Sequence, residues 1–365
     1  MNFRIKKLVV LSIIFIFIIS GNLAHAQVLE NSFTQSLPAI NHNKIIQNGL
    51  QTIDKQRRAE NSYYTIQTRS SKLKKLEQWY NSHPSVEFAS LVKGTITIKF
   101  IDGSYTLLLD IIPKKDSKYI EVPDINYNYP DIPYYSTEDG IKSAMILNPS
   151  EYLYGNRHCK KIIKTLINNG YSIEYLINED VDLPLVRDNL YAEIIYINTH
   201  AGFWDLDGDH QGDVVVIATG EYWTNETKEI YNFEFENQMI VEGVVGNQSF
   251  IAFTPTFIEY YYQSNNLPES LIYMATCHAT YDDSMANAFL NSGARAYMGW
   301  TRDTIYWINS YTSVLAFRLF SKGFTVKQVC LIIRHGGIIN FFLRSRLTYY
   351  GNGRSRISTL SITKK

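Results

Sequence analysis

Two apolar stretches decide the fold of this sequence: Ile194-Ile-Tyr-Ile-Asn-Thr-His-Ala-Gly202 and Leu271-Ile-Tyr-Met-Ala-Thr-Cys-His278. Each begins as a short strand of apolar and aromatic residues and reaches a reactive side chain, His200 in the first and Cys277 in the second. In an open α/β sheet, ligands bind outside the carboxyl ends of the strands. If the two strands are neighbours, the imidazole and the thiol therefore share one edge of the sheet.

Alternating strand and helix signals surround these two stretches. We expect further strands at 143–147, 171–177, 214–219 and 294–300. We expect helices at 159–168, 284–292 and 326–333, and a short helix or loop at 182–190. Asn169-Gly170 and Gly293 are residues of the kind that end helices. Strands that alternate with helices predict an α/β layered fold with parallel strands.

The chain before residue 141 has a different pattern. It is polar up to about residue 82, with weak helical signals at 54–60 and 71–79. Asp102-Gly103 then separates two β-rich runs, 94–101 and 105–112, which is a strong hairpin signal. The organisation that we predict is a signal peptide at 1–26, a small β-containing accessory domain or pro-segment at 27–112, a proline-rich linker or surface loop at 113–140, a main domain at 141–353 and a basic tail at 354–365.

Composition places the chain among globular proteins. It has 365 residues, of which 45% are hydrophobic and 19% charged, and this excludes a collagen, a coiled coil and a wholly disordered chain. The 35 basic and 35 acidic side chains give zero formal charge. We therefore expect no nucleic-acid partner, because such a protein needs a basic excess.

The first residues have the pattern of an export signal. Arg4, Lys6 and Lys7 precede an apolar run, and Ala24-His-Ala26 resembles a cleavage site. We expect a secreted or periplasmic protein without membrane contact after cleavage. An uncleaved membrane anchor is the alternative. The oligomeric state stays open.

The pairing of His200 with Cys277 has a chemical meaning. A thiol is a weak nucleophile until it becomes a thiolate, and a nearby imidazole can accept its proton. Backbone N–H groups of Cys277 and of the turn at Ala201 or Gly202 could form an oxyanion hole. The alternative is that Cys277 is a small buried residue and His200 a structural one. His278 is a poor base for Cys277, because side chains of adjacent residues diverge.

Asn198-Thr-His-Ala-Gly202 followed by Ala275-Thr-Cys-His-Ala279 resembles the caspase-like cysteine peptidases, in which strand–His–Gly precedes strand–Ala–Cys. Residues 284–300 are similar to the helix–Gly–Ala–strand segment of gingipain-like members. Leu347-Thr-Tyr-Tyr-Gly351 is similar to their Leu-x-x-x-Gly-Asp-Pro closing segment. The resemblance covers about 141–353 and implies a three-layer α/β/α sandwich with a mostly parallel sheet.

The resemblance also implies a function. His200 would be the general base and acid, Cys277 the nucleophile, and the reaction hydrolysis of a peptide or protein substrate through a thioester, with no cofactor required for the chemistry. Three positions depart from the family pattern: Ala201 directly follows the His, Asn352 stands where Asp is usual, and Ala275 stands where clostripain-like members have an acidic specificity residue. An inactive relative or another Cys-dependent acyl transferase or hydrolase stays open.

Substrate binding is expected near the end of the last predicted strand. Asp303, or Asp282 and Asp283 after the Cys, could bind an Arg or Lys side chain, and Trp300 could form a wall of that pocket. The alternatives are that the carboxylates are solvated or cap a helix, and that Trp300 packs in the core.

An acidic loop follows His200. Asp205, Asp207, Asp209 and Asp213 place four carboxylates in nine residues, and a hard cation such as calcium prefers converging oxygens of this kind. The loop resembles integrin-type calcium loops, and a solvated acidic turn is the alternative. A second hypothesis follows from it: a non-catalytic, calcium-binding secreted protein on the same scaffold.

The chain has three cysteines. Cys277 is the candidate reactive thiol. Cys159 and Cys330 fall in predicted helices and are expected in the core, and whether they pair as a disulfide stays open.

Overall fold

The computed structural model describes residues 40–59, 66–110, 142–263, 267–337, 341 and 344–357. The chain divides into two compact units, 1–46 and 47–365, and both β-sheets belong to the second. The predicted signal peptide, the predicted linker and most of the predicted basic tail lie outside the described residues. No helix in the described part of the chain has both the length and the apolar character that crossing a bilayer requires.

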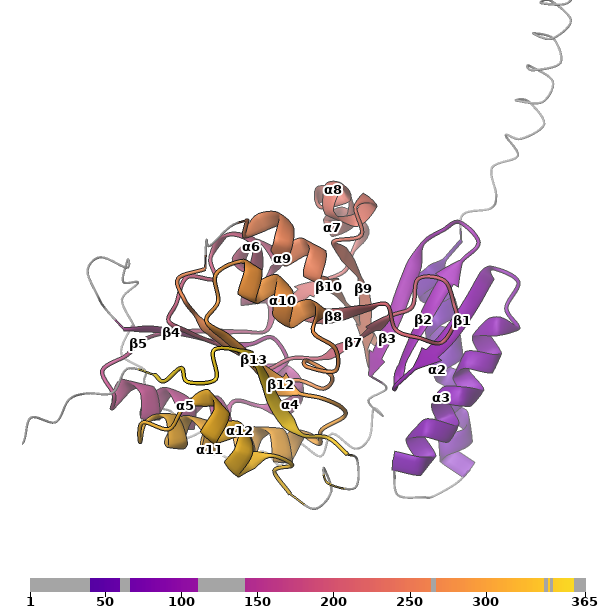
Figure 1. Ribbon diagram of the computed structural model, residues 1–365. Coiled ribbons are helices and arrows are strands. Elements are labelled where there is room, and N and C mark those ends of the chain that lie inside the picture. Colours follow the sequence, from indigo (N-terminus) through magenta and orange to yellow (C-terminus); the bar gives the residue numbers. More distant parts are fainter. Residues whose placement is uncertain are drawn as a thin grey trace, which may run out of the picture. The chain divides into compact units, whose positions relative to one another are not determined.

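A six-stranded sheet forms the centre of the C-terminal part of the chain (Figure 1). Its order is β13-β12-β11-β6-β4-β5. The first five strands along the chain pair in parallel, and only β13 is antiparallel. The strands are β4 (Ser143–Asn148), β5 (Ser172–Ile177), β6 (Ile194–Ile197), β11 (Leu271–Met274), β12 (Ala296–Trp300) and β13 (Leu347–Gly351).

Helices cover both faces of this sheet (Figure 1). Side chains alternate between the two faces of a strand, so Ile194 and Tyr196 join one buried cluster while Ile195 and Ile197 join the other. Because both clusters are apolar, the short strands are buried on both sides. The cluster with Ile194 and Tyr196 includes side chains of the helices α5 (Arg157–Ile167), α11 (Tyr306–Phe320) and α12 (Val326–Ile333). The cluster with Ile195 and Ile197 includes side chains of α6 (Leu183–Asp188), α9 (Pro255–Tyr261) and α10 (Ser284–Asn291).

A second, seven-stranded sheet has the order β1-β2-β3-β9-β10-β8-β7. Only β3 and β9 pair in parallel, and the other neighbours are antiparallel. The tight Gly246-Asn247 connection between β9 and β10 explains one of the antiparallel pairs. Its strands are β1 (Val86–Val92), β2 (Thr95–Phe100), β3 (Tyr105–Asp110), β7 (Ala201–Trp204), β8 (Val214–Tyr222), β9 (Ile240–Val245) and β10 (Gln248–Phe253).

The α/β prediction is confirmed, but the expectation of one mostly parallel sheet is not, because the second sheet is mixed. The predicted strand at 214–219 is found as β8, yet it pairs antiparallel with β7 and β10 instead of joining the parallel strands. Alternating strand and helix signals did not indicate β7, β9 and β10. The remaining short elements are α4 (Glu151–Tyr154), η1 (Asn178–Asp180), α7 (Asn225–Ile230) and α8 (Asn232–Glu236).

The predicted hairpin of the N-terminal segment is confirmed. Its strands β2 and β3 pair antiparallel around the Asp102-Gly103 turn, where Gly103 has φ 85°. The weak helical signals belong to longer helices, α2 (His42–Ala59) and α3 (Ile66–Asn81). Because β3 pairs with β9, the hairpin lies in the same sheet as β7, the strand that directly follows His200.

Candidate active site

The two strands that lead to His200 and Cys277 are neighbours. β6 and β11 pair in parallel, from Leu271 opposite Ile194 to Met274 opposite Ile197. His200 lies three residues after Ile197, and Cys277 lies three residues after Met274. The two residues are therefore equally far beyond the last paired residues of their strands. Both line one cavity of about 140 Å³. The structure therefore brings together the two residues that the sequence singled out.

His200 is buried, and its two ring nitrogens have different surroundings. Nδ1 lies 3.9 Å from Asp110 Oδ2, beyond direct hydrogen-bond distance. Nε2 has no hydrogen-bond partner among the described residues. The ring of Tyr154 packs against the imidazole at 5.4 Å between centroids. Burial lowers the pKa of His200; the Asp110 carboxylate raises it and the Arg69 guanidinium lowers it further. The imidazole is therefore neutral at neutral pH and can accept a proton.

Cys277 is partly exposed and its sulfur contacts one residue on the loop after β12. The backbone N–H of Thr304 donates to Sγ at 3.3 Å, and Sγ lies 3.6 Å from the carbonyl oxygen of the same residue. Burial raises the pKa of the Cys277 thiol to about 12, with a further rise from Asp303, while the Thr304 N–H and Arg69 lower it. One cavity therefore holds a neutral thiol and a neutral imidazole, and in the resting site His200 Nε2 and Cys277 Sγ are not hydrogen-bonded to each other.

Arg69 brings a positive charge into the cavity from the N-terminal segment. One guanidinium nitrogen lies 3.1 Å from Asp110 Oδ1, and another lies 3.9 Å from Asp303 Oδ1. Arg69 is on α3 and Asp110 ends β3, so two charged groups of the site come from the segment 27–112, which we predicted to be an accessory domain or pro-segment. The hairpin signal could have located the end of β3, but no local pattern connects it with His200.

Ala201 is better placed than Gly202 to supply an oxyanion donor. The carbonyl of His200 accepts from the N–H of Ala218 on β8, and N–H groups alternate sides along a strand. The N–H of Ala201 therefore points away from β8, and Ala201 lines the cavity. Gly202 has a packing role, because a Cβ at that position would lie 2.5 Å from the Oγ1 of Thr95 on β2.

A buried asparagine connects the two strands that lead to His200 and Cys277. Asn309 Nδ2 donates to Asn198 Oδ1 at 3.3 Å and to the carbonyl of Ala275 at 2.9 Å. Those acceptors lie two residues before His200 and two before Cys277. The Oδ1 of Asn309 accepts from Trp300 Nε1 at 2.9 Å. Asn309 therefore joins the two strand ends, and no local sequence pattern indicated this role.

The predicted substrate-binding residues lie in different surroundings in the structure. Asp303 lines the cavity, and its Oδ1 lies 3.0 Å from His278 Nε2. Trp300 is fully buried and lies outside the cavity lining, so its position agrees with the alternative of core packing. Asp282 accepts from the N–H and hydroxyl of Ser284, the first residue of α10, whereas the cap residue Asp283 makes no side-chain hydrogen bond to the helix.

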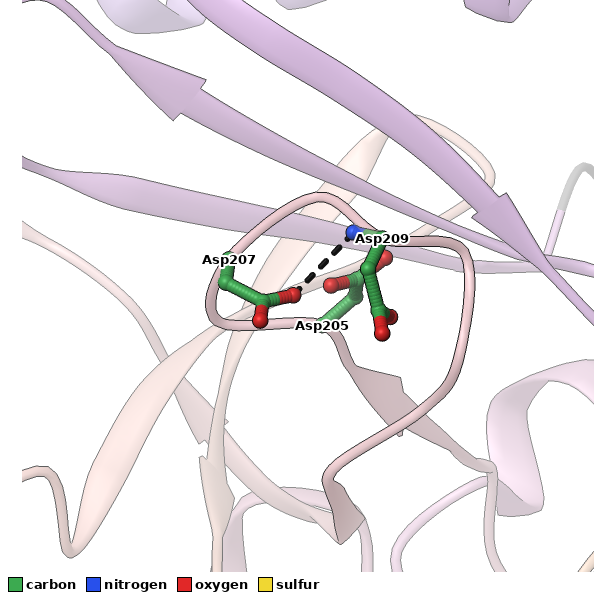
Figure 2. A group of neighbouring side chains, drawn as sticks. All are labelled: Asp205, Asp207 and Asp209. Atoms are coloured by element: carbon green, nitrogen blue, oxygen red, sulfur yellow. Dashed lines mark hydrogen bonds between the residues drawn. The ribbon is translucent and has the colours of Figure 1, made fainter.

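Three carboxylates of the acidic loop approach one another (Figure 2). Asp205, Asp207 and Asp209 each have an oxygen within 4.8 Å of the others, and the backbone N–H of Asp209 donates to Asp207. Asp205 is fully buried, and its two oxygens accept from Ser90 Oγ and from the backbone of Gly208 and His210. Asp213 is not in this group, and one of its oxygens accepts from the N–H of Leu206 instead. The loop could hold a cation with three carboxylates, not four.

All three cysteines are free thiols, so Cys159 and Cys330 are not joined. Both are buried, as expected for core residues. Burial raises their pKa values too, which keeps them protonated.

We expect Asn309→Leu to destabilise the fold by about 3 kcal/mol, because it leaves the indole N–H of Trp300 and the carbonyl of Ala275 without this partner. Urea denaturation followed by circular dichroism measures the loss. Thr312→Val on the same helix is the control. Its hydroxyl donates to the carbonyls of Ile308 and Asn309 on its own helix, and we expect a loss below about 1 kcal/mol. Equal losses for the two variants would contradict a bridging role.

No protein-family model matches the sequence, and no curated protein matches it.

Proposed function

We propose that this protein is an exported cysteine endopeptidase of the caspase-like type, with His200 and Cys277 as a catalytic dyad. One observation carries the proposal: the two side chains follow the carboxyl ends of adjacent parallel strands in matching register and line one cavity. Ligands of open α/β sheets bind at this edge. A nucleophile and a base in one cavity are the minimum that covalent acyl transfer requires.

The six-stranded sheet supports the proposed kinship. Five of its strands run parallel, helices cover both faces, and the proposed closing segment Leu347–Gly351 pairs beside β12 as the edge strand β13. On this proposal the seven-stranded sheet is an addition to the caspase-like core. Export follows from the predicted signal peptide, and the substrate is a peptide or protein.

The proposed reaction begins with two neutral groups. His200 Nε2 takes the proton of the Cys277 thiol as the sulfur attacks the carbonyl carbon of the scissile peptide bond. The carbonyl oxygen becomes an oxyanion, which the N–H groups of Ala201 and Cys277 stabilise. The C–N bond then breaks, and the imidazolium returns its proton to the leaving amine. Water, deprotonated by His200, hydrolyses the resulting thioester, which gives the carboxylic acid and regenerates the thiol. The chemistry requires no cofactor.

We expect the exported protein to cleave members of a peptide library and Cys277→Ala to reduce that cleavage by at least about 10³-fold. His200→Ala should produce a similar loss, because the thiol would lack its proton acceptor. Mass spectrometry of product peptides measures cleavage. Cys330→Ala is the matched control, since it removes a buried thiol outside the cavity lining. Equal cleavage by wild type and Cys277→Ala, or none by wild type with and without calcium, would refute the proposal.

The pH dependence of hydrolysis should report the charges around His200. We expect kcat/KM to rise with pH through the pKa of His200 and to stay level through neutral pH. Asp110→Asn should move this acidic limb to lower pH, because Asp110 raises the pKa of His200. Arg69→Met should move it to higher pH, because Arg69 lowers that pKa. A pH–rate profile of each variant tests this, and shifts in the same direction would contradict the assignment of His200 as the base.

The second candidate function is calcium binding by a non-catalytic protein, and the convergence of Asp205, Asp207 and Asp209 favours it. We expect calorimetry to detect calcium binding at millimolar or lower concentration. Asp207→Asn combined with Asp209→Asn should abolish it, because it removes two of the three carboxylates that converge, and both are exposed. Asp213→Asn should retain binding. Absence of binding by the wild type at that concentration would exclude the site.

A further inference from the structure

The loop between β12 and α11 holds the sulfur of Cys277. Thr304 on this loop donates its backbone N–H to Sγ at 3.3 Å. A donor of this kind has its main effect on the thiolate, since a hydrogen bond to a charged acceptor is about twice as strong as one to a neutral acceptor. The position of this short loop therefore matters for the reactivity of Cys277.

His278 anchors that loop at two points. Its Nε2 lies 3.0 Å from Asp303 Oδ1, and its backbone N–H donates to the carbonyl of Arg302 at 3.3 Å. The imidazole is itself held in place, because it is buried against the ring of Phe203 at 5.0 Å and that of Tyr281 at 6.1 Å between centroids.

The backbone at His278 has a conformation that non-glycine residues rarely adopt. Its φ is +57°, in the left-handed region. Strain of this kind persists only where the surroundings determine the conformation, and it concentrates at functional sites. Here the turn directs the His278 side chain to Asp303 while the preceding residue, Cys277, faces the cavity.

We propose that His278 and Asp303 are positioning residues, which hold the Thr304 N–H on Cys277 Sγ so that the thiolate meets a fixed donor as it forms. Neither residue touches the reacting atoms in this role. The catalytic meaning of the pair depends on the proposed peptidase function, but the effect on the thiolate does not. Asp303 is then part of the support of the nucleophile and not a binding group for a basic substrate.

The electrostatics of the site agree with this role. Burial raises the pKa of Cys277 and the charge of Asp303 adds to the rise, whereas the Thr304 N–H lowers it. Burial also acts to raise the pKa of Asp303, but the hydrogen bond and charge of His278, with Arg69 and Arg302, hold it below its usual value. The other titratable or charged side chains that line the cavity with Cys277 are Arg69, Lys93, Asp110, Tyr154, His200 and Tyr306.

The test is the pH midpoint of alkylation of Cys277 by iodoacetamide, followed by peptide mass mapping of the full chain with chelator present. A change in access alone alters the rate but not this midpoint. We expect His278→Asn to raise the midpoint, with about tenfold less thiolate at any pH below it. Asn tolerates a positive φ but is too short to reach Asp303. An unchanged midpoint in a folded variant would overturn the proposal.

His210→Asn is the matched control. His210 also has a positive φ, +67°, and its Nε2 also lies 3.0 Å from a carboxylate, that of Glu77, but it is exposed and outside the cavity lining. We expect it to leave the midpoint unchanged. A shift equal to that of His278→Asn would show a general effect of losing such a pair, and it would also refute the proposal.

Two charge-matched variants of Asp303 give an independent measurement. Asp303→Asn and Asp303→Ala both remove the negative charge, but only Asn keeps an acceptor for His278. We expect about tenfold less thiolate in Asp303→Ala than in Asp303→Asn, and equal midpoints would overturn the proposal. Because alkylation needs no substrate, the alkylation midpoints can be measured whether or not the protein hydrolyses peptides. Shifted midpoints without peptide cleavage would support the positioning role and refute the proposed peptidase function.

Discussion

The parallel pairing of β6 with β11 is the constraint on which the candidate site depends. Matching register places His200 and Cys277 at the same level beyond the sheet, and Asn309 joins the two strand ends through hydrogen bonds to Asn198 and to the carbonyl of Ala275. Burial on both faces stabilises this pairing, because the side chains of each strand alternate between two apolar clusters. A slip in register would separate the imidazole from the thiol and leave Asn309 without its acceptors.

Burial also determines the protonation states of His200 and Cys277. It raises the pKa of Cys277 and lowers that of His200, so both side chains are neutral in the resting site. A preformed thiolate–imidazolium pair is therefore not the ground state of this arrangement. In the proposed reaction, fixed donors such as the N–H of Thr304 gain importance because they would act on the charge that develops during proton transfer.

The seven-stranded sheet connects the N-terminal segment with the site. The hairpin β2–β3 packs on β7 where Gly202 allows close approach, and its far end brings Asp110 near His200. Buried side-chain hydrogen bonds reinforce the connection: Ser90 of β1 donates to Asp205 after β7, and Thr106 of β3 donates to Glu242 of β9. Such buried polar pairs specify one arrangement, since an unpaired buried carboxylate is unfavourable. The N-terminal segment thus contributes charged groups to the cavity.

The amino-acid sequence by itself indicated many of the local elements, though not β7, β9 and β10, and it singled out the candidate reactive residues. Periodicity located the parallel strands, Asp102-Gly103 located a hairpin, and position at strand ends singled out His200 and Cys277. Tertiary structure alone decided which strands are neighbours, that β8 joins the mixed sheet, that Trp300 is buried, and that Arg69 and Asp110 reach the cavity. The physical reason is the distance along the chain over which each effect acts. Hydrophobic periodicity and turn preference act over a few residues, whereas pairing, burial and the pKa shifts that follow from burial depend on contacts between residues far apart in the chain.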